Sequence, residues 1–254
     1  MNVLRFCAKT ALFLLTTLVL SPLYIFILFL FYPWRLSIGP GLVRFYSGIC
    51  LAIYRVKIRQ GKGSRSLKKL KGSLLIISNH ASFLDIFVLS ARFGTAFVSK
   101  AEVRTYPVIG QIARLMGSIF FDRASSKERM RVLNSVARGH SGRVLAVFPQ
   151  GTTGGISERL SFHRGIFKVI ELNPKLTIVP VTLYYRDDAG IAWVRPQSLR
   201  ENAARVCGQK KIPVKLIVHQ PVTIEDYRGK TAAEVCRMVE NTVLGPLAKP
   251  YREL

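Results

Sequence analysis

The feature that most constrains this chain is a run of 22 residues without a charge, Ala11–Tyr32. As an α-helix the run would be about 33 Å long, enough to cross a hydrocarbon core of about 30 Å. Arg5 and Lys9 precede it and Trp34 comes after it, as is typical of segments that meet a membrane interface. The run is longer than the apolar core of a signal peptide, and no A-x-A-like cleavage site follows it. We therefore expect a membrane anchor.

Pro22 leaves the form of this anchor open. A proline inside a helix removes a backbone donor, so it can kink a spanning helix or divide the run into two shorter helices that lie in one leaflet. The next stretch, Leu42–Tyr54, is also largely apolar, with Arg44 as its one charge. Residues 1–54 are thus predicted to form either one spanning helix or a two-helix interfacial anchor.

The net charge of +24, from 38 Lys and Arg against 14 Asp and Glu, attracts polyanions. No acidic residue precedes Asp85, and eight basic residues lie between Arg55 and Lys71. A nucleic-acid site would interleave aromatic residues with such cations, and this stretch holds none. A bilayer surface fits better, because each cation near anionic headgroups contributes about 1 kcal/mol of attraction. Membrane lipids, especially anionic ones, are the predicted partners, and nucleic acid is not.

From residue 73 onward, short apolar runs alternate with stretches of helical spacing. The runs predict buried strands at 73–78, 96–99, 117–121, 143–148, 176–185 and 214–219. The other stretches predict helices at 82–92, 108–116, 125–140, 164–172 and 231–247. This alternation is typical of an α/β domain whose central mixed, partly parallel sheet is flanked by helices. We expect one such domain over residues 55–254.

A histidine motif, NHASFLD over residues 79–85, comes directly after the first predicted strand. Open α/β sheets bind their ligands beyond the carboxyl ends of the strands. Ser82 is a good N-cap for the next helix, so Asp85 would fall in its first turn and reach back to the ring of His80. A carboxylate that holds one ring nitrogen leaves the other to take a proton from a hydroxyl. Taken alone, the pair fits a structural ion pair equally well.

Three further blocks lie downstream, GSIFFDR at 117–123, FPQGTT at 148–153 and IVPV at 178–181. Together with the histidine motif they resemble, in order and spacing, the NHxSxxD, GxIFIDR, FPEGTR and VPV-type blocks of the glycerolipid acyltransferase family. The type member of that family is the 1-acylglycerol-3-phosphate (lysophosphatidic acid) acyltransferase. VSKAE at 98–102 and PVIG at 107–110 are similar to the family's segment between its first two blocks. The resemblance covers roughly residues 70–185.

The resemblance implies an acyltransferase domain that moves a fatty acyl chain from acyl-CoA or acyl-carrier protein to the free hydroxyl of a lysolipid. The acceptor it favours is 1-acylglycerol-3-phosphate, which would give phosphatidic acid. His80 would be the general base, oriented by Asp85, and the hydroxyl would attack the thioester directly with no acyl-enzyme. Arg123 and Lys100 would hold the acceptor's anionic headgroup, as a planar fork and a point charge. Neither a bound cofactor nor a metal is expected.

The third block completes the expected acceptor site but departs from the family pattern. Gly151, in a tight turn after a strand, can present backbone N–H groups to a phosphate or a developing oxyanion, and Thr152 lies beside it. Gln150 stands where the family has Glu, and Thr153 where it has Arg. Gln is nearly isosteric with Glu but also donates hydrogen bonds. Arg164 is a candidate replacement for the missing Arg.

Two alternatives remain open at this point. Thr153 with the following two glycines is similar to the third block of lyso-ornithine lipid acyltransferases, whose acceptor has no glycerol phosphate. The chain is then an acyltransferase on such a lysolipid, or it is a catalytically inactive membrane lipid-binding protein. His80 and Asp85 are both present, which argues against the inactive alternative. The expected location is a membrane, with the catalytic domain on the cytoplasmic face of a bacterial inner membrane.

Overall fold

The computed structural model describes residues 3–61, 73–105, 109–115, 117–122, 125–138, 144–158 and 160–253. Over these residues seven strands form one sheet in the order β1-β7-β6-β2-β5-β3-β4. The strands are β1 (Val56–Gln60), β2 (Leu74–Ser78), β3 (Ala96–Lys100), β4 (Ile119–Phe121), β5 (Val144–Val147), β6 (Thr177–Tyr185) and β7 (Ile212–Val218). Neighbours pair in parallel except β6 and β7, which are antiparallel. The predicted mixed, partly parallel sheet is confirmed.

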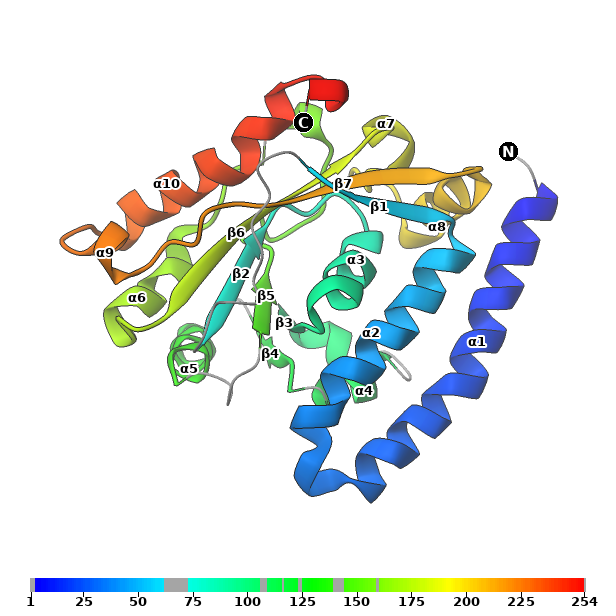
Figure 1. The fold of residues 1–254 in the computed structure, drawn as a ribbon, viewed down its shortest axis with the longest axis horizontal. Coiled ribbons are helices and arrows are strands. Elements are labelled where there is room, and N and C mark those ends of the chain that lie inside the picture. Colours follow the sequence, from blue (N-terminus) through cyan, green and yellow to red (C-terminus); the bar gives the residue numbers. More distant parts are fainter. Residues whose placement is uncertain are drawn as a thin grey trace.

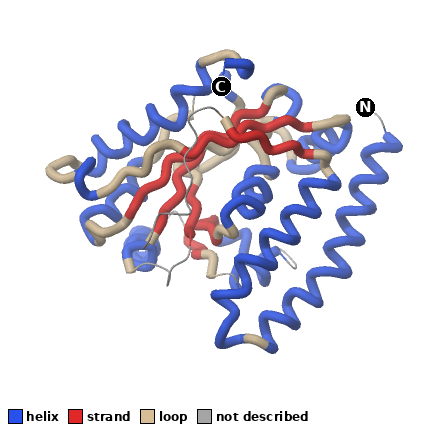
Figure 2. The backbone as a smooth tube through the Cα atoms, viewed as in Figure 1, coloured by secondary structure: helices blue, strands red, loops and turns tan. Residues whose placement is uncertain are grey.

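Helices cover both faces of the sheet (Figures 1 and 2). Leu74 and Ile76 of β2 belong to one core cluster, with α2 (Arg35–Ile53), α3 (Leu84–Phe93) and α8 (Leu199–Gly208). Leu75 and Ile77 belong to the other, with α5 (Ser126–Ala137), α6 (Val169–Leu172) and α10 (Ala232–Leu244). The other helices are α1 (Val3–Leu30), α4 (Ile109–Leu115), α7 (Asp188–Ile191) and α9 (Ile224–Tyr227). Strand β2 is therefore buried on both faces, and the loop at its carboxyl end is held at the centre of the fold.

Strand β1 was not predicted, because it lies inside the basic run that begins at Arg55. It pairs in parallel with β7 at the edge of the sheet. Val56 is buried, whereas the other four residues of the strand are exposed. A strand with one buried side chain lacks the apolar alternation on which strand prediction depends. Residues 62–71 of the same run lie outside the described residues.

The predicted helix at 164–172 is also corrected. A 3₁₀ turn over Arg164–Lys168 leads into the short α6. By contrast, the closing helix α10 begins as its sequence indicates, since Thr231 and Glu234 form a reciprocal capping box. For α5, the Ser125 hydroxyl accepts from the Glu128 N–H, but the Glu128 carboxylate accepts from the Asp122 N–H instead of closing the box.

α1 and α2 form an antiparallel hairpin whose turn lies far from the sheet (Figure 1). α1 continues through Pro22, so the proline does not divide it; the chain turns at residues 31–34 and then enters α2. Eleven large apolar side chains of α1 are at least half exposed: Val3, Leu4, Leu12, Leu14, Leu15, Leu18, Val19, Leu23, Phe26, Phe29 and Leu30. α1 is also long and apolar enough to cross a membrane. That residues 1–54 act as a separate anchoring domain stays a prediction.

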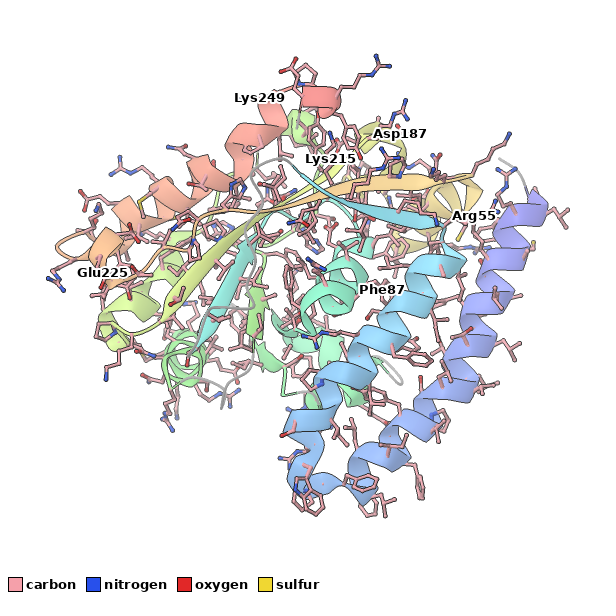
Figure 3. All side chains as sticks on the ribbon, in the orientation of Figure 1. Arg55, Phe87, Asp187, Lys215, Glu225 and Lys249 are labelled. Carbon is pink, nitrogen blue, oxygen red and sulfur yellow. The ribbon has the colours of Figure 1, made fainter. Side chains whose placement is uncertain are left out.

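The inner side of the hairpin packs on α3 and on the end of α8. Phe13 of α1 meets Phe87 of α3 edge to face, with ring centroids 6.2 Å apart, and Figure 3 shows Phe87 between the sheet and the hairpin. At the start of α1, Lys9 Nζ donates to the Gln209 carbonyl at 2.7 Å and Arg5 donates to the Gly208 carbonyl at 2.9 Å. These carbonyls are at the end of α8, where the helix dipole favours cations. The hairpin is thus fixed to the domain by charge-assisted bonds to the main chain.

Replacement of Lys9 by Met tests this attachment. Lys9 is 6% exposed, and hydrogen bonds from charged groups contribute about 1.5–3 kcal/mol each. Lys9→Met should lower the free energy of unfolding in detergent micelles by about 2 kcal/mol. Lys175→Met, which changes an exposed lysine of the same charge, is the control. Equal unfolding midpoints for the two variants would contradict the attachment.

Candidate active site

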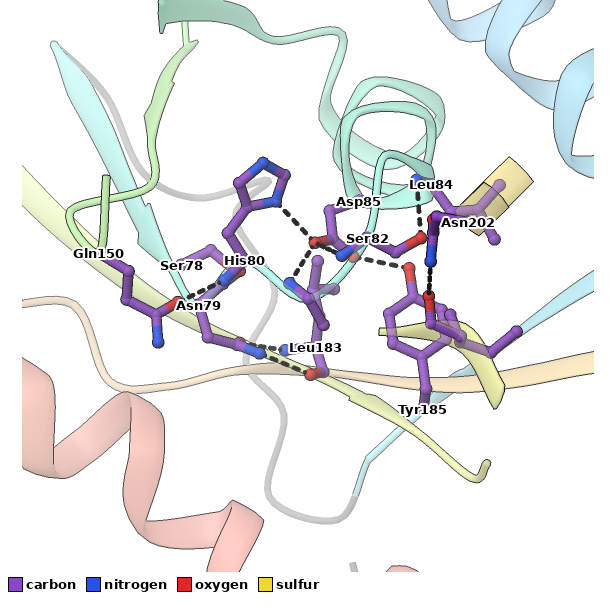
Figure 4. A network of polar contacts seen from close by, with 12 residues as sticks. Ser78, Asn79, His80, Ser82, Leu84, Asp85, Gln150, Leu183, Tyr185 and Asn202 are labelled. Atoms are coloured by element: carbon purple, nitrogen blue, oxygen red, sulfur yellow. Dashed lines mark hydrogen bonds and ion pairs between the residues drawn. The ribbon is translucent and has the colours of Figure 1, made fainter. Parts of the chain in front are cut away.

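The loop after β2 is fastened to the neighbouring strand by the first residue of the histidine motif. Asn79 is buried, and its side-chain amide both donates to the Leu183 carbonyl, at 2.9 Å, and accepts from the Leu183 N–H, at 2.8 Å. This reciprocal pair continues the parallel pairing of β2 with β6 by one residue (Figure 4). Sequence reasoning did not single out Asn79. Its effect is to fix the direction in which the chain leaves β2, and so the position of His80.

The Asp85 carboxylate is fully buried and is surrounded by donors. Oδ2 accepts from the N–H groups of Ala81, at 2.7 Å, and Ser82, at 2.8 Å. The second oxygen, Oδ1, accepts from the Tyr185 hydroxyl at 2.6 Å. Asp85 lies in the first turn of α3 as predicted, but α3 begins at Leu84 and its N-cap is Phe83, not Ser82. The Ser82 hydroxyl still accepts from the Leu84 N–H, at 3.4 Å, while the Asp85 carboxylate binds the two N–H groups that precede the helix.

His80 completes this arrangement. Its Nδ1 lies 2.8 Å from Asp85 Oδ2, the third contact of that oxygen. Because a carboxylate oxygen that binds two backbone N–H groups is an acceptor, Nδ1 carries the proton and Nε2 is the basic nitrogen. The ring stacks on Phe148, with centroids 4.0 Å apart, and its side chain keeps 17% exposure. In Figure 4 the second ring nitrogen points away from the polar network.

The loop after β5 holds the backbone of His80. Since β2 and β5 are parallel neighbours, their carboxyl ends lie side by side. The Gln150 side chain accepts from the His80 N–H at 2.7 Å and donates to the Leu160 carbonyl at 3.0 Å. The Gly154 N–H donates to the His80 carbonyl at 3.0 Å. Gln150 was predicted to bind substrate, and its amide is engaged with the loop backbone here.

Gly151 forms the predicted tight turn. It has a φ of 75°, a backbone conformation that favours glycine, and its N–H donates to the Phe148 carbonyl at 3.1 Å. That this turn presents backbone N–H groups to a phosphate or an oxyanion stays a prediction. In the described part of the chain, the N–H groups of Thr152 and Thr153 make no hydrogen bond to protein, so they are the donors available at this turn.

A pocket of about 350 Å³ adjoins the turn. Its lining includes four of the predicted residues besides Lys100, namely Gln150, Gly151, Thr152 and Thr153. Glu158, Leu160, His163 and Arg195 complete it. Arg164 is exposed and is not among the lining residues, whereas Arg195 brings a guanidinium there. Arg123 lies outside the described residues, and its role stays a prediction.

Arg195 and Tyr185 are two further side chains at this site that sequence reasoning missed. The Trp193 N–H donates to the Ala81 carbonyl at 2.7 Å, which brings the segment containing Arg195 against the histidine loop. Tyr185 ends β6, and only the pairing of β6 with β2 brings it to Asp85. Neither has a local motif, although the position of Tyr185 at the carboxyl end of a predicted strand was a usable signal.

Burial perturbs two acids around the pair. The pKa of the Tyr185 hydroxyl is raised well above its usual value by desolvation and by the Asp85 carboxylate. Desolvation, followed by the charge of Asp85 and other carboxylates, also raises the pKa of Asp188, which accepts from the Ile156 N–H at 2.8 Å. Because its pKa is raised, the Tyr185 hydroxyl stays protonated and donates its hydrogen bond to Asp85.

Chemically, the arrangement is a base with an orienting carboxylate. Nε2 can accept a proton from a hydroxyl group, and the buried Asp85 stabilises the imidazolium that results. Among the described residues no three His, Cys, Asp or Glu side chains gather as metal ligands would. The neighbouring pocket supplies cations and backbone donors for an anionic group.

A family model described as "Acyltransferase" matches residues 56–184, which is half of the chain. The chain belongs to the acyltransferase family. The match includes the histidine loop, Lys100, the turn at Gly151 and most of β6. This acyltransferase is thus an enzyme, and the fold described above is the one that carries its chemistry.

Known relatives divide between two kinds of acceptor. The acyltransferase is 29% identical over 174 residues to the lyso-ornithine lipid O-acyltransferase of Pseudomonas aeruginosa, an alignment that covers 67% of this chain and 66% of that protein. It is 28% identical to the 1-acyl-sn-glycerol-3-phosphate acyltransferase of Limnanthes alba, over 99% of this chain and 86% of that one. The crystal structure of the 1-acyl-sn-glycerophosphate (LPA) acyltransferase PlsC from Thermotoga maritima superposes with a TM-score of 0.70 over 98% of both chains, at 17% identity. This last likeness is one of fold.

The contacts of Gln150 make a prediction for the variant that restores the family's Glu. An ionised glutamate at this position still accepts from the His80 N–H but cannot donate to the Leu160 carbonyl, so Gln150→Glu should destabilise the fold at pH 7 by about 1–3 kcal/mol. The carbonyl raises the pKa of the new carboxyl, and the loss should therefore grow as the pH rises above about 4.3. Thermal unfolding between pH 4 and 8 measures it. Gln111→Glu, on an exposed position of α4, should show neither effect, and matching curves would contradict this role of Gln150.

Proposed function

We propose that this acyltransferase moves a fatty acyl chain from acyl-CoA or acyl-carrier protein to the free hydroxyl of a lysolipid. The observation that carries the proposal is the His80–Asp85 pair: Nδ1 is held at 2.8 Å by a buried carboxylate, while Nε2 makes no bond within the described residues and stays partly exposed. An inactive lipid-binding protein would have no use for a base held in one tautomer.

In the proposed mechanism, the acceptor hydroxyl binds against Nε2 of His80 and gives up its proton as its oxygen attacks the thioester carbonyl. Asp85 stabilises the imidazolium through Nδ1. The N–H groups of Thr152 and Thr153, which make no hydrogen bond among the described residues, would donate to the oxyanion of the tetrahedral intermediate. Collapse of the intermediate breaks the carbon–sulfur bond, and the thiolate takes the proton from the imidazolium. No acyl-enzyme forms, since the hydroxyl itself is the nucleophile.

The first candidate acceptor is 1-acylglycerol-3-phosphate, which would give phosphatidic acid. Lys100 and Arg195 line the pocket beside the turn, and an ammonium with a guanidinium is a suitable pair for a phosphate monoester. Arg123, from the second block of the sequence, is proposed as a further headgroup ligand. The Limnanthes alba relative carries this acceptor in its name.

A second candidate is a lyso-ornithine lipid, whose headgroup pairs a carboxylate with an ammonium. Glu158 favours it, because this residue puts a carboxylate in the same pocket as the two cations. Glu158 Oε2 accepts from the Gly155 N–H at 3.0 Å, which leaves Oε1 to meet an ammonium. A phosphate monoester would be repelled by that charge. The Pseudomonas aeruginosa relative bears the corresponding name.

We further propose that the α1–α2 hairpin inserts into the membrane as a two-helix anchor, with the domain on the cytoplasmic face. Both ends of the hairpin lead back to the domain, α1 through Arg5 and Lys9 and α2 through its contacts with α3. Burial of each exposed Leu or Phe of α1 in lipid would contribute about 1.5–3 kcal/mol. The exposed aromatic residues Tyr32 and Trp34 are at the hairpin turn.

His80→Ala tests the reaction. Loss of a general base should lower kcat by about 10²–10⁴-fold towards either acceptor, while the chain still folds and its membrane-bound fraction stays at the wild-type value. The measurement is transfer of radiolabelled acyl groups from the thioester. His219→Gln, which removes a histidine that is bonded to Thr182 at another part of the sheet, should keep its turnover. Turnover by His80→Ala within threefold of wild type would remove the base assignment.

Glu158→Gln separates the two acceptors. It neutralises the pocket carboxylate while keeping an acceptor for the Gly155 N–H. For lyso-ornithine lipid the KM should rise about tenfold or more, since an ionic contact of about 1.4 kcal/mol corresponds to a factor of ten. For 1-acylglycerol-3-phosphate the KM should fall, because a repulsive charge is removed. The acceptor for which the wild-type enzyme has the higher kcat/KM is the favoured candidate. If Glu158→Gln leaves the KM of both acceptors unchanged, Glu158 is not part of the headgroup site.

A further inference from the structure

The two carboxylate oxygens of Asp85 bind different partners. Oδ2 receives three contacts from its own loop, those of Ala81, Ser82 and His80. Oδ1 receives the hydroxyl of Tyr185, a residue 100 positions away in the sequence, at 2.6 Å. Tyr185 is 1% exposed and lies at the carboxyl end of β6, adjacent to β2 (Figure 4).

A buried phenol needs a hydrogen-bond acceptor, but a main-chain carbonyl satisfies that need. Tyr227 shows this in the same protein, since its hydroxyl donates to the carbonyls of Pro174 and Leu176, at 2.8 and 3.0 Å. Tyr185 donates instead to the carboxylate that holds the catalytic imidazole. The bond has two effects. It fixes the rotation of the carboxyl group, so that Oδ2 faces Nδ1, and it withdraws negative charge from the group that stabilises the imidazolium.

We propose that Tyr185 is a positioning residue that sets the basicity of His80 through Asp85. The proposal rests on the proposed function of His80 as general base. With the Tyr185 bond in place, the carboxylate stabilises the imidazolium less than a bare carboxylate would, so His80 releases its proton to the leaving thiolate and is neutral again for the next acceptor. Without the bond, the imidazolium is more stable and the carboxyl group keeps only the contacts of Oδ2 to hold its orientation.

Other charges around the pair do not account for such an effect. Asp188 of α7 is a further carboxylate whose charge acts on both Asp85 and Tyr185. The pocket adds four charged or titratable groups: Lys100, Glu158, His163 and Arg195. All of them are unchanged by a substitution at position 185, so a difference in pH dependence between variants reports on the Tyr185 hydroxyl.

The test compares Tyr185→Phe with wild type in acyl transfer over pH 5 to 9. Loss of the donor should move the acid limb of the kcat/KM profile to higher pH by about 0.5–1 unit, a fraction of what a hydrogen bond to a charged group can shift. The plateau value of kcat should fall about tenfold, within the contribution of general-base catalysis, while the acceptor KM stays unchanged. Tyr227→Phe loses the hydroxyl of another buried tyrosine and should be destabilised without any movement of the limb.

A second substitution covers the case in which Tyr185→Phe does not fold. Site-specific 3-fluorotyrosine at position 185 keeps the shape and makes the phenol a stronger donor, so the limb should move to lower pH. A limb that coincides with wild type in both variants would overturn the proposal and leave Tyr185 as a structural hydroxyl. Failure of the proposed function has a different signature, because His80→Ala would then keep its turnover.

Discussion

The fold of the site depends on one buried negative charge. A carboxylate without solvent exposure is costly unless donors surround it, and Asp85 has four, from two backbone N–H groups, an imidazole and a phenol. These donors come from the histidine loop and from β6, so the charge joins segments that are distant in sequence. The same bonds that offset its desolvation determine which nitrogen of His80 carries the proton. Stability and reactivity at this point therefore rest on the same contacts.

The sheet order explains why the remaining parts converge there. β2 lies between β6 and β5, and all three run parallel, so their carboxyl ends supply the histidine loop, Tyr185 and the turn at Gly151. The loop after β5 binds both the N–H and the carbonyl of His80, through the Gln150 side chain and the Gly154 N–H. In this acyltransferase the Gln amide uses its donor as well as its acceptor, which gives a physical reason for an amide at the family's carboxylate position.

The features that depend on nearby residues could be predicted from the sequence. His80 and Asp85 are five positions apart, and the strands of the buried sheet are apolar runs. Tyr185 and Arg195 could not be predicted in this way, because strand pairing and the Trp193–Ala81 bond bring them to the site. Strand β1 was not predicted because its pairing with β7 makes it a strand, whereas its sequence has no apolar alternation. Sequence reasoning placed backbone donors at the turn of Gly151, but which N–H groups of that turn are unengaged depends on the bond from the Gly151 N–H to the Phe148 carbonyl.

The attachment of α1 has a consequence for how this protein can vary. Arg5 and Lys9 bind carbonyl oxygens of the main chain at positions 208 and 209, and every amino acid supplies such an oxygen. Substitutions at positions 208 and 209 therefore preserve these hydrogen bonds, whereas loss of Arg5 or Lys9 removes one of them. The orientation of the hairpin on the domain can therefore be kept while positions 208 and 209 change. The selective constraint falls on Arg5 and Lys9 of α1.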